Sequence, residues 1–347
     1  MKTLQLGRTG IEVPDWCLGT MTYGNQTPLE DAHLQIDMCL DVGLNFLDTA
    51  EMYPVNPIRA ETVGRSEEVI GEWVAKSGRR SELTIATKVS GDNPGWVRGG
   101  AGYDGAMMRE AIEGSLRRLQ TDVIDVYQMH WPMRGSYMFR QNWTYDPSKQ
   151  SRQETMDHMH DVLSALGELV KEGKIRAIGM SNESAWGMTK WVDFAEEHGL
   201  PRMATVQNEY SLLCRLYDTD MAEMAVNEDV TLLSFSPLAC GLLTGKYQGG
   251  VVPEGSRMSI GPELGGRMTP RTLDVTQVYL DLAQKHGVDP VHMAMAWQRT
   301  RPFPISAIFG ATTSDQLTHI LEGRDLVLTD ELCAEIDQLH RANPYPY

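Results

Sequence analysis

The sequence predicts a closed barrel of eight parallel strands in which a helix follows each strand. Short segments rich in β-forming residues alternate with longer segments of helical periodicity, and the alternation occurs eight times in 347 residues. A repeat of this kind fits a (β/α)8 TIM barrel better than an open doubly wound sheet. No shift in composition divides the chain, so we expect residues 1–347 to form a single α/β domain.

The strands are predicted from short apolar segments. They cover residues 16–19, 44–48, 83–88, 123–128, 175–179, 204–207, 231–235 and 305–309. Ahead of them, residues 3–6 and 11–13 flank a glycine-containing turn at residues 7–10. This pattern predicts a β-hairpin that covers the floor of the barrel.

The helices between the strands are predicted from apolar residues at spacings of three and four. One apolar stripe runs from Met108 to Leu119, and another runs from Met159 to Val170. Glycine is a common residue at the end of a helix because it tolerates the left-handed conformation. Four glycines are therefore expected at helix ends: Gly78, Gly173, Gly199 and Gly287.

Four segments are too long for ordinary connections between elements. They are residues 89–105, 131–152, 237–271 and the tail after Leu339. The first three follow predicted strands, so they would emerge at the C-terminal face of the barrel. Catalytic loops are found at that face, and we expect the active site there.

Composition and charge exclude several classes of function. The formal net charge of −16 argues against non-specific nucleic-acid binding, which needs a basic surface. No apolar run approaches the ~18 residues of a membrane span. The five cysteines are scattered without a C-x-x-C pair, and no apolar N-terminal region suggests a signal peptide, so a cytoplasmic protein is expected. The expected partner is a small molecule, and a monomer or a homo-oligomer is equally compatible.

Four polar residues lie at or just beyond consecutive predicted strands. Asp48 and Lys88 each close a strand, Tyr53 follows in the next turn, and His130 lies two residues beyond the fourth strand. Taken singly, each has an ordinary structural explanation, such as a turn cap or a packed loop residue. In a barrel, however, all four would converge on one mouth.

The chemistry of these four residues is coherent. A lysine ammonium beside a tyrosine would stabilise the phenolate and lower the pKa of the phenol. A carboxylate would keep the lysine charged, and a histidine N–H can orient a carbonyl oxygen. The set suits protonation of a developing alkoxide while a hydride arrives at carbon.

A cofactor site is predicted without a Rossmann motif. Gly100, Gly102 and Gly105 form a G-x-G-x-x-G pattern that no strand directly precedes, so we interpret it as a flexible loop. Residues 310–316 instead close the eighth strand and open a helix, whose N-terminus favours a phosphate. The loop after the seventh strand adds small residues together with Lys246 and Arg257, which can neutralise a pyrophosphate.

Amide side chains at two further strand ends suit a carboxamide. Ser181 and Asn182 end the fifth strand, and Gln207 ends the sixth. Such groups can pair with the donor and the acceptor of a nicotinamide amide. Phe235, at the end of the seventh strand, can stack on a flat ring, although a core role is equally compatible.

Together these motifs resemble the aldo-keto reductases. The matching segments span nearly the whole chain and are residues 18–21, 46–53, 86–88, 115–119, 130–132, 173–182, 207–213, 236–247 and 310–312. The ordered set is similar to the bacterial Tas-like branch, which is related to voltage-gated potassium-channel β subunits.

The resemblance implies an NADP(H)-dependent oxidoreductase. It implies Tyr53 as proton donor, tuned by Lys88 and Asp48, with His130 orienting the carbonyl. The implied cofactor contacts are Gly19, Thr20, Met21, Asp48, Ser181, Asn182, Gln207, Phe235, Ser236, Pro237, Leu238, Gly241, Lys246, Arg257, Gly310, Thr312 and Gln316. One departure concerns adenine, because many relatives have Glu-Asn where this chain has His319-Ile320. Ile320 lacks the amide hydrogen bonds, so we expect weaker recognition of adenine.

Aromatic residues are predicted to form the walls of the substrate pocket, and they are Tyr23, Trp96, Trp131, Trp143 and Tyr210. Aromatic walls with few fixed charges suit a small aldehyde, ketone or sugar-like carbonyl, reduced to its alcohol.

Two other functions remain open. Lys88 can be the Schiff-base nucleophile of a lyase, although the amides and the phosphate loop then have no role. Alternatively, the protein can bind NADP(H) as a redox-sensing regulator, which an intact set of catalytic residues does not exclude. A metal hydrolase is disfavoured because His158 and His160 fall on different helix faces with no further ligands, so no metal is predicted.

Overall fold

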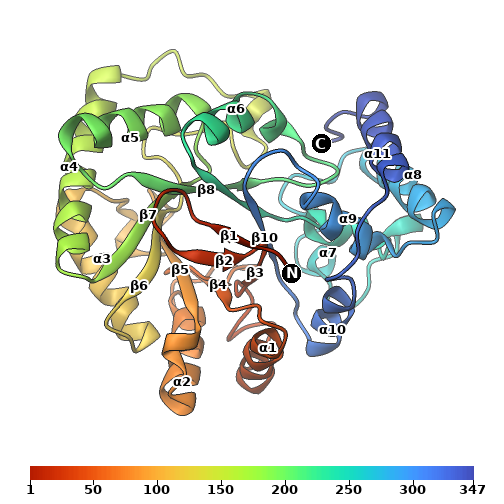
Figure 1. The fold of residues 1–347 in the computed structure, drawn as a ribbon, viewed down its shortest axis with the longest axis horizontal. Helices are drawn as coiled ribbons and strands as arrows, with labels where there is room; N and C mark the ends of the chain where they lie inside the picture. Colours follow the sequence, from red (N-terminus) through yellow and green to blue (C-terminus); the bar gives the residue numbers. More distant parts are fainter.

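The computed structural model describes residues 1–347 as a closed barrel of eight parallel strands inside a ring of helices (Figure 1). The strands follow one another around the barrel in chain order, and the last pairs with the first. They are β3 Trp16–Gly19, β4 Phe46–Asp48, β5 Thr84–Val89, β6 Ile124–Met129, β7 Ile175–Ser181, β8 Met203–Glu209, β9 Thr231–Phe235 and β10 Ile305–Phe309. All eight predicted strands are present, and only their ends differ. The predicted (β/α)8 TIM barrel is confirmed.

Helices fill the connections between strands. Their bounds are α1 Leu29–Asp41, α2 Arg65–Ser77, α3 Gly105–Leu119, α4 Arg152–Lys171, α5 Ala185–His198, α6 Asp220–Asn227, α7 Arg257–Ile260, α8 Thr272–Lys285, α9 Pro290–Gln298, α10 Ser314–Glu322 and α11 Asp330–Ala342. Gly78 and Gly199 cap α2 and α5 in the left-handed conformation, as predicted. Because α11 continues to Ala342, the irregular tail is shorter than expected. No helix combines the length and apolar character needed to cross a membrane.

The N-terminal hairpin covers one end of the barrel, as predicted. Strands β1 Thr3–Gln5 and β2 Glu12–Pro14 pair antiparallel and lie across the middle of the barrel in Figure 1. Gly7, in the turn, donates its N–H to Thr231 Oγ1 at 3.0 Å. At its φ of +49°, a Cβ atom would lie 2.9 Å from two backbone carbonyl oxygens, so only glycine fits.

The hairpin and the barrel interior share one apolar cluster. Its buried members are Leu6, Ile11, Val13, Cys17, Phe46, Ala86, Val126, Ala177, Ala204, Leu233 and Ile308. The barrel is therefore a packed core closed at its floor, and the opposite, C-terminal face is left for chemistry.

Three long loops emerge at the C-terminal face and are tied down by ion pairs. Arg98, in the loop after β5, lies 2.5 Å from Glu51 and also donates to the carbonyls of Ser90 and Gly102. The glycine motif at residues 100–105 was expected to be a flexible loop, but these contacts fix its start. The loops after β6 and β9 both reach Glu209, through Arg140 at 2.7 Å and Arg267 at 2.8 Å.

Candidate active site

The four predicted catalytic residues meet at the C-terminal mouth of the barrel. Lys88 Nζ lies 2.7 Å from Asp48 Oδ2 and 3.4 Å from Tyr53 Oη, and it also donates to the Thr49 carbonyl at 2.7 Å. The rings of Tyr53 and His130 touch edge to face, with centroids 5.7 Å apart. The parallel register of β4, β5 and β6 brings these strand ends together, so residues far apart in the sequence form one cluster.

Burial dominates the electrostatics of Tyr53. Burial raises the pKa of the phenol, and the nearby Lys88 opposes this only in part, so the net pKa is raised. Lys88 does lower the pKa of the phenol, as predicted, but the net pKa is raised because the cost of burying a phenolate is larger. Tyr53 is therefore protonated at neutral pH and can donate a proton.

Lys88 stays charged although its side chain is fully buried. Burial lowers the pKa of the ammonium, but the charge of Asp48 and the contacts with Asp48 and Tyr53 raise it, and the net shift is upward. A buried charge is tolerated only when it is paired, which the contact with Asp48 provides. Asp48 in turn accepts a hydrogen bond from Gln207 Nε2 at 2.8 Å.

His130 is neutral in this site. Burial, and next the charge of Lys88, lower the pKa of its imidazole well below the ordinary value. A neutral imidazole can donate one N–H, which suits the orientation of a carbonyl oxygen. Its backbone carbonyl accepts a hydrogen bond from Asn182 Nδ2 at 2.9 Å, which joins the catalytic group to the amide cluster.

The amide cluster is a site that fits a carboxamide. Ser181 Oγ donates to the Gln207 carbonyl at 2.7 Å, and Asn182 Nδ2 lies 3.0 Å from Ser181 Oγ. Asn182 Oδ1 is buried and has no hydrogen-bond partner in the protein. A buried acceptor without a partner is costly, and the N–H of a nicotinamide amide would satisfy it.

The turn after β9 has the composition expected around an anion. Ser236, Cys240 and Gly241 all have positive φ angles, which directs the backbone into a tight turn. Burial lowers the pKa of Arg257, whose guanidinium pairs with no carboxylate, and Lys246 is an exposed cation beside the same turn. Cations without carboxylate partners in a protein of net charge −16 fit a bound phosphate group.

The loop after β10 caps the N-terminus of helix α10. Thr313 caps α10 by accepting from the Gln316 N–H, and Gln316 Oε1 accepts from the Thr312 N–H at 3.1 Å. Thr312 and Gln316 thus lie together at the start of α10. The other predicted cofactor residues lie at or beside the C-terminal ends of β3, β9 and β10, and they are Gly19, Thr20, Met21, Phe235, Pro237, Leu238 and Gly310.

Two of the predicted aromatic wall residues, Trp96 and Trp131, lie near the mouth. The ring of Trp131 lies 5.0 Å from that of His130, and Trp96 and Trp131 pack on the small apolar cluster of Ala50, Met52 and Val97. Trp143 is 70% exposed and donates its Nε1–H to the Tyr347 carbonyl at 3.2 Å, so it packs against the C-terminal segment.

Tyr23 and Tyr210 do not form pocket walls, and these two predictions are wrong. Both side chains are completely buried. The Tyr23 hydroxyl lies 3.3 Å from Gln35 Oε1 on α1, and the ring of Tyr210 stacks on Trp297 at 5.1 Å. Both rings belong to the core between strands and helices, where no substrate can reach them.

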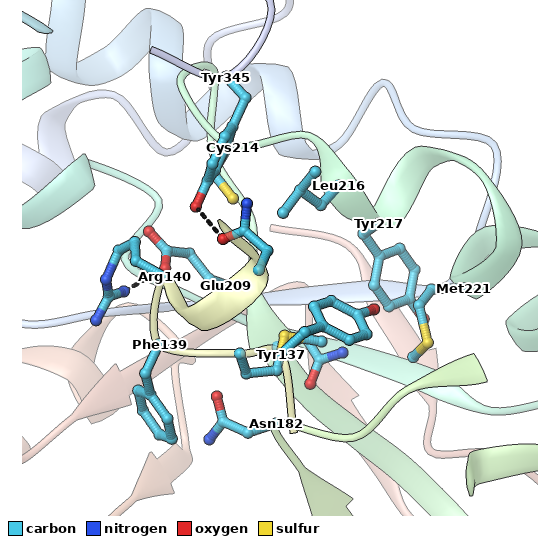
Figure 2. A pocket seen from close by; sticks show the side chains of 13 residues that line it. Tyr137, Phe139, Arg140, Asn182, Glu209, Cys214, Leu216, Tyr217, Met221 and Tyr345 are labelled. Carbon is cyan, nitrogen blue, oxygen red and sulfur yellow. Dashed lines mark hydrogen bonds and ion pairs between the residues drawn. The ribbon is translucent and has the colours of Figure 1, made fainter. Parts of the chain in front are cut away.

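A hollow beside Asn182 was not predicted from the sequence (Figure 2). It is a narrow cavity with an interior volume of about 20 Å³ that opens to solvent. It is lined by the loop after β6, the end of β8 and the C-terminal segment, through Tyr137, Met138, Phe139, Arg140, Asn142, Asn182, Asn208, Glu209, Cys214, Leu216, Tyr217, Met221 and Tyr345. In the sequence, only the unusual length of the loop at 131–152 indicated a cavity here. The residues that line it come from segments that are far apart in the chain.

Glu51 is a second residue that the sequence did not reveal. Its carboxylate accepts from the Ser90 N–H at 2.6 Å and from Arg98 at 2.5 Å. Burial raises the pKa of the Glu51 carboxyl, and Arg98 opposes the shift. The contact ties the loop that bears Trp96 to the segment that bears Tyr53.

Comparison with known proteins agrees with the motifs. The sequence profile of the Aldo/keto reductase family matches residues 16–341. Protein tas of Escherichia coli (strain K12) is 41% identical over 352 residues, which cover 100% of this chain and 99% of that protein. The uncharacterized oxidoreductase YrpG of Bacillus subtilis (strain 168) is 31% identical, with 98% and 96% covered. A probable voltage-gated potassium channel subunit beta of Arabidopsis thaliana is 28% identical, with 99% and 98% covered. The predicted resemblance is confirmed: the chain is an oxidoreductase that belongs to the aldo/keto reductase family.

Proposed function

We propose that this protein is an NADP(H)-dependent reductase that converts a small aldehyde, ketone or sugar-like carbonyl into an alcohol, with Tyr53 as the proton donor. The observation that carries the proposal is the buried chain of contacts from Asp48 through Lys88 to Tyr53. A neutral His130 lies against the same phenol. A protonated phenol beside a fixed ammonium suits delivery of a proton to an alkoxide.

In this reaction each residue of the catalytic group would have its own role. When bound, a nicotinamide cofactor would supply the hydride. The Tyr53 O–H bond breaks as the new O–H bond of the alcohol forms, which leaves a phenolate. Lys88 stabilises this phenolate at 3.4 Å, and Asp48 keeps the lysine charged. The N–H of neutral His130 would orient the carbonyl oxygen toward the phenol.

The cofactor would lie across the mouth of the barrel. Asn182 and Gln207 would hold its carboxamide, and Phe235 would stack on the nicotinamide ring. The turn at 236–241 with Lys246 and Arg257 would hold the phosphates, and Thr312 with Gln316 would contact the adenosine. The unpaired Asn182 Oδ1 and the unpaired guanidinium of Arg257 support this placement.

The experiment that tests the proposal is a fluorescence titration with NADPH and with NADH, followed by turnover on a panel of aldehydes. We expect tight, NADPH-selective binding and measurable reduction. Failure to bind either coenzyme would overturn the proposal.

Replacement of Tyr53 by Phe tests the assigned proton donor. Because the hydroxyl supplies the proton but little of the coenzyme contact, Tyr53→Phe should lower kcat by roughly 10²–10⁴-fold. The dissociation constant for NADPH should stay nearly the same. A large loss of coenzyme affinity would instead assign Tyr53 a structural role.

A redox-sensing regulator is a second candidate, and the similarity to a potassium channel β subunit favours it. Tight coenzyme binding with negligible turnover over many carbonyls would support this function.

A Schiff-base lyase is disfavoured, since Lys88 is fully buried and its raised pKa keeps the amine protonated. Borohydride treatment with a carbonyl substrate should therefore trap no adduct.

We also propose a cytoplasmic location, because all five cysteines are free thiols.

A further inference from the structure

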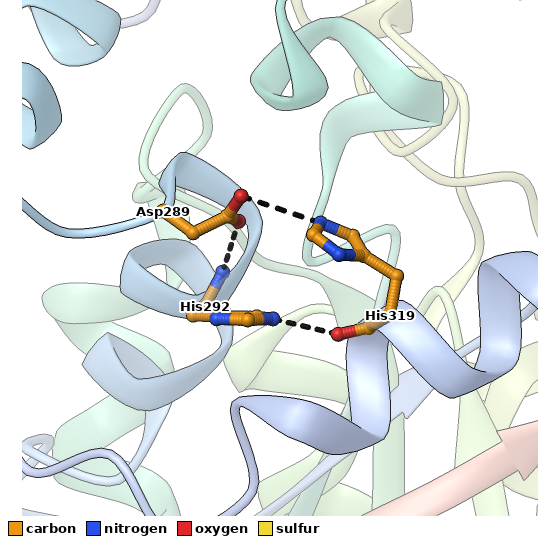
Figure 3. A group of neighbouring side chains, drawn as sticks. All are labelled: Asp289, His292 and His319. Carbon is orange, nitrogen blue, oxygen red and sulfur yellow. Dashed lines mark hydrogen bonds and ion pairs between the residues drawn. The ribbon is translucent and has the colours of Figure 1, made fainter.

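Three side chains that commonly bind metals lie together outside the mouth, where α9 meets α10 (Figure 3). Asp289 is the N-cap of α9, His292 lies in the first turn of that helix, and His319 lies on α10. A ring nitrogen of each histidine and a carboxylate oxygen of Asp289 all lie within 4.8 Å of one another. Imidazole and carboxylate groups at this spacing are a ligand set for a divalent transition metal.

One pair of atoms already has the spacing that a metal imposes. Asp289 Oδ2 lies 3.3 Å from His319 Nε2. In a tetrahedral zinc site with bonds of about 2.0–2.1 Å, two ligand atoms are separated by about 3.4 Å. These two atoms, which form an ion pair when His319 is protonated, can share a cation at their present separation, and the His292 nitrogen, within 4.8 Å, has to move closer to complete the site.

Two of the three residues have their other polar atom hydrogen-bonded, and the third has a carboxylate nearby. His292 Nε2 lies 2.6 Å from the His319 carbonyl oxygen, which leaves Nδ1 as the nitrogen with a lone pair. His319 Nδ1 lies 3.7 Å from Glu322 Oε2. Asp289 Oδ1 accepts from the N–H groups of Val291 and His292 at 2.8 and 3.2 Å. Histidines that bind metals usually donate the other ring N–H to a carbonyl or a carboxylate, and the hydrogen bond of His292 fits that pattern.

The packing leaves room for the His292 ring and keeps the site open. A Cβ atom at Gly323 would lie 2.4 Å from the His292 ring, so a glycine there lets the ring lie between the two helices. The side chains of His319 and Asp289 are 46% and 34% exposed. An ion can reach them from solvent, and water can complete the coordination.

We propose that Asp289, His292 and His319 bind one divalent cation of the zinc class, with a water as the fourth ligand. The cation fastens the start of α9 to the middle of α10. The cation takes no part in the chemical step, and its binding can be measured without coenzyme. The sequence did not indicate this site, because His292 and His319 come from different helices separated by a strand.

The test is a titration of the chelator-treated, dialysed full chain with ZnCl2, followed by isothermal calorimetry and by thermal unfolding. We expect one zinc ion per chain and a rise in Tm when zinc is added, because the ion binds the folded state. Removal of one of three ligands by His319→Gln should weaken zinc binding by at least about tenfold and abolish the rise in Tm. Since His319 is half-exposed, this variant should fold normally.

The matched control is His198→Gln. His198 and His160 form another histidine pair, with ring centroids 5.6 Å apart, but no carboxylate completes it. This variant should bind zinc as the parent protein does. The proposal is overturned if the parent protein binds no zinc at micromolar concentrations, or if His319→Gln leaves the stoichiometry and affinity unchanged.

Discussion

At Tyr53, burial and the neighbouring Lys88 shift the pKa of the phenol in opposite directions, and burial prevails. Reduction needs the protonated phenol, so its rate should be constant through neutral pH and fall only in alkali, as the phenol ionises. Alcohol oxidation needs the phenolate and should become faster as the pH rises. Profiles of kcat/KM against pH in both directions check these opposite slopes.

The lowered pKa of His130 gives the same profiles a second feature. Protonation of this imidazole should occur only in acid, well below the ordinary histidine value of about 6.5. The rate of reduction should therefore show no step near that value. A step centred there would mean that His130 titrates normally and that its burial is lost in solution.

At the scale of elements, Glu209 lies at the hollow of Figure 2 and joins a loop that borders it to a second long loop. Its carboxylate pairs with Arg140 from the loop after β6 and with the buried Arg267 from the loop after β9. Removal of one partner from a buried ion pair typically costs about 3–5 kcal/mol. Glu209→Gln should therefore loosen both loops, with faster amide hydrogen exchange in residues 131–152 and 257–271.

Glu68→Gln provides the matched control for that prediction. Glu68 pairs with Arg65 on an exposed helix surface, where such a pair contributes about 0–1 kcal/mol. Its hydrogen exchange should resemble that of the parent protein. Equal exchange in the loops of both variants would contradict the role given to Glu209.

At the scale of the whole molecule, the N-terminal hairpin completes the core of the barrel. Leu6 is fully buried among residues from the strands. Leu6→Ala should lower the free energy of unfolding by about 2–5 kcal/mol, because it removes buried methyl groups and leaves a cavity. Urea denaturation measures this loss. Val327→Ala, at a position that is 85% exposed, should change stability little.

The barrel and the convergence of Asp48, Lys88 and His130 could be predicted because both follow from chain order. Strand ends of a parallel barrel share one face, so a polar residue at a strand end has a known location. The orientation of Tyr23 and Tyr210 could not be predicted, because it depends on packing between strands and helices. The net pKa shift of Tyr53 likewise depends on burial, and the links of Glu209 to Arg140 and Arg267 depend on loop paths.

The hydrogen bond from Gln207 to Asp48 has a consequence for how the chain folds. It joins β8 to β4 across 159 positions of sequence, so it can form only after most of the barrel has assembled. A nascent chain that has reached only β7 has Asp48 and Lys88 but lacks this partner. Recovery of turnover during refolding should therefore lag behind the recovery of helical signal, and catalysis becomes a kinetic marker of the moment the barrel closes.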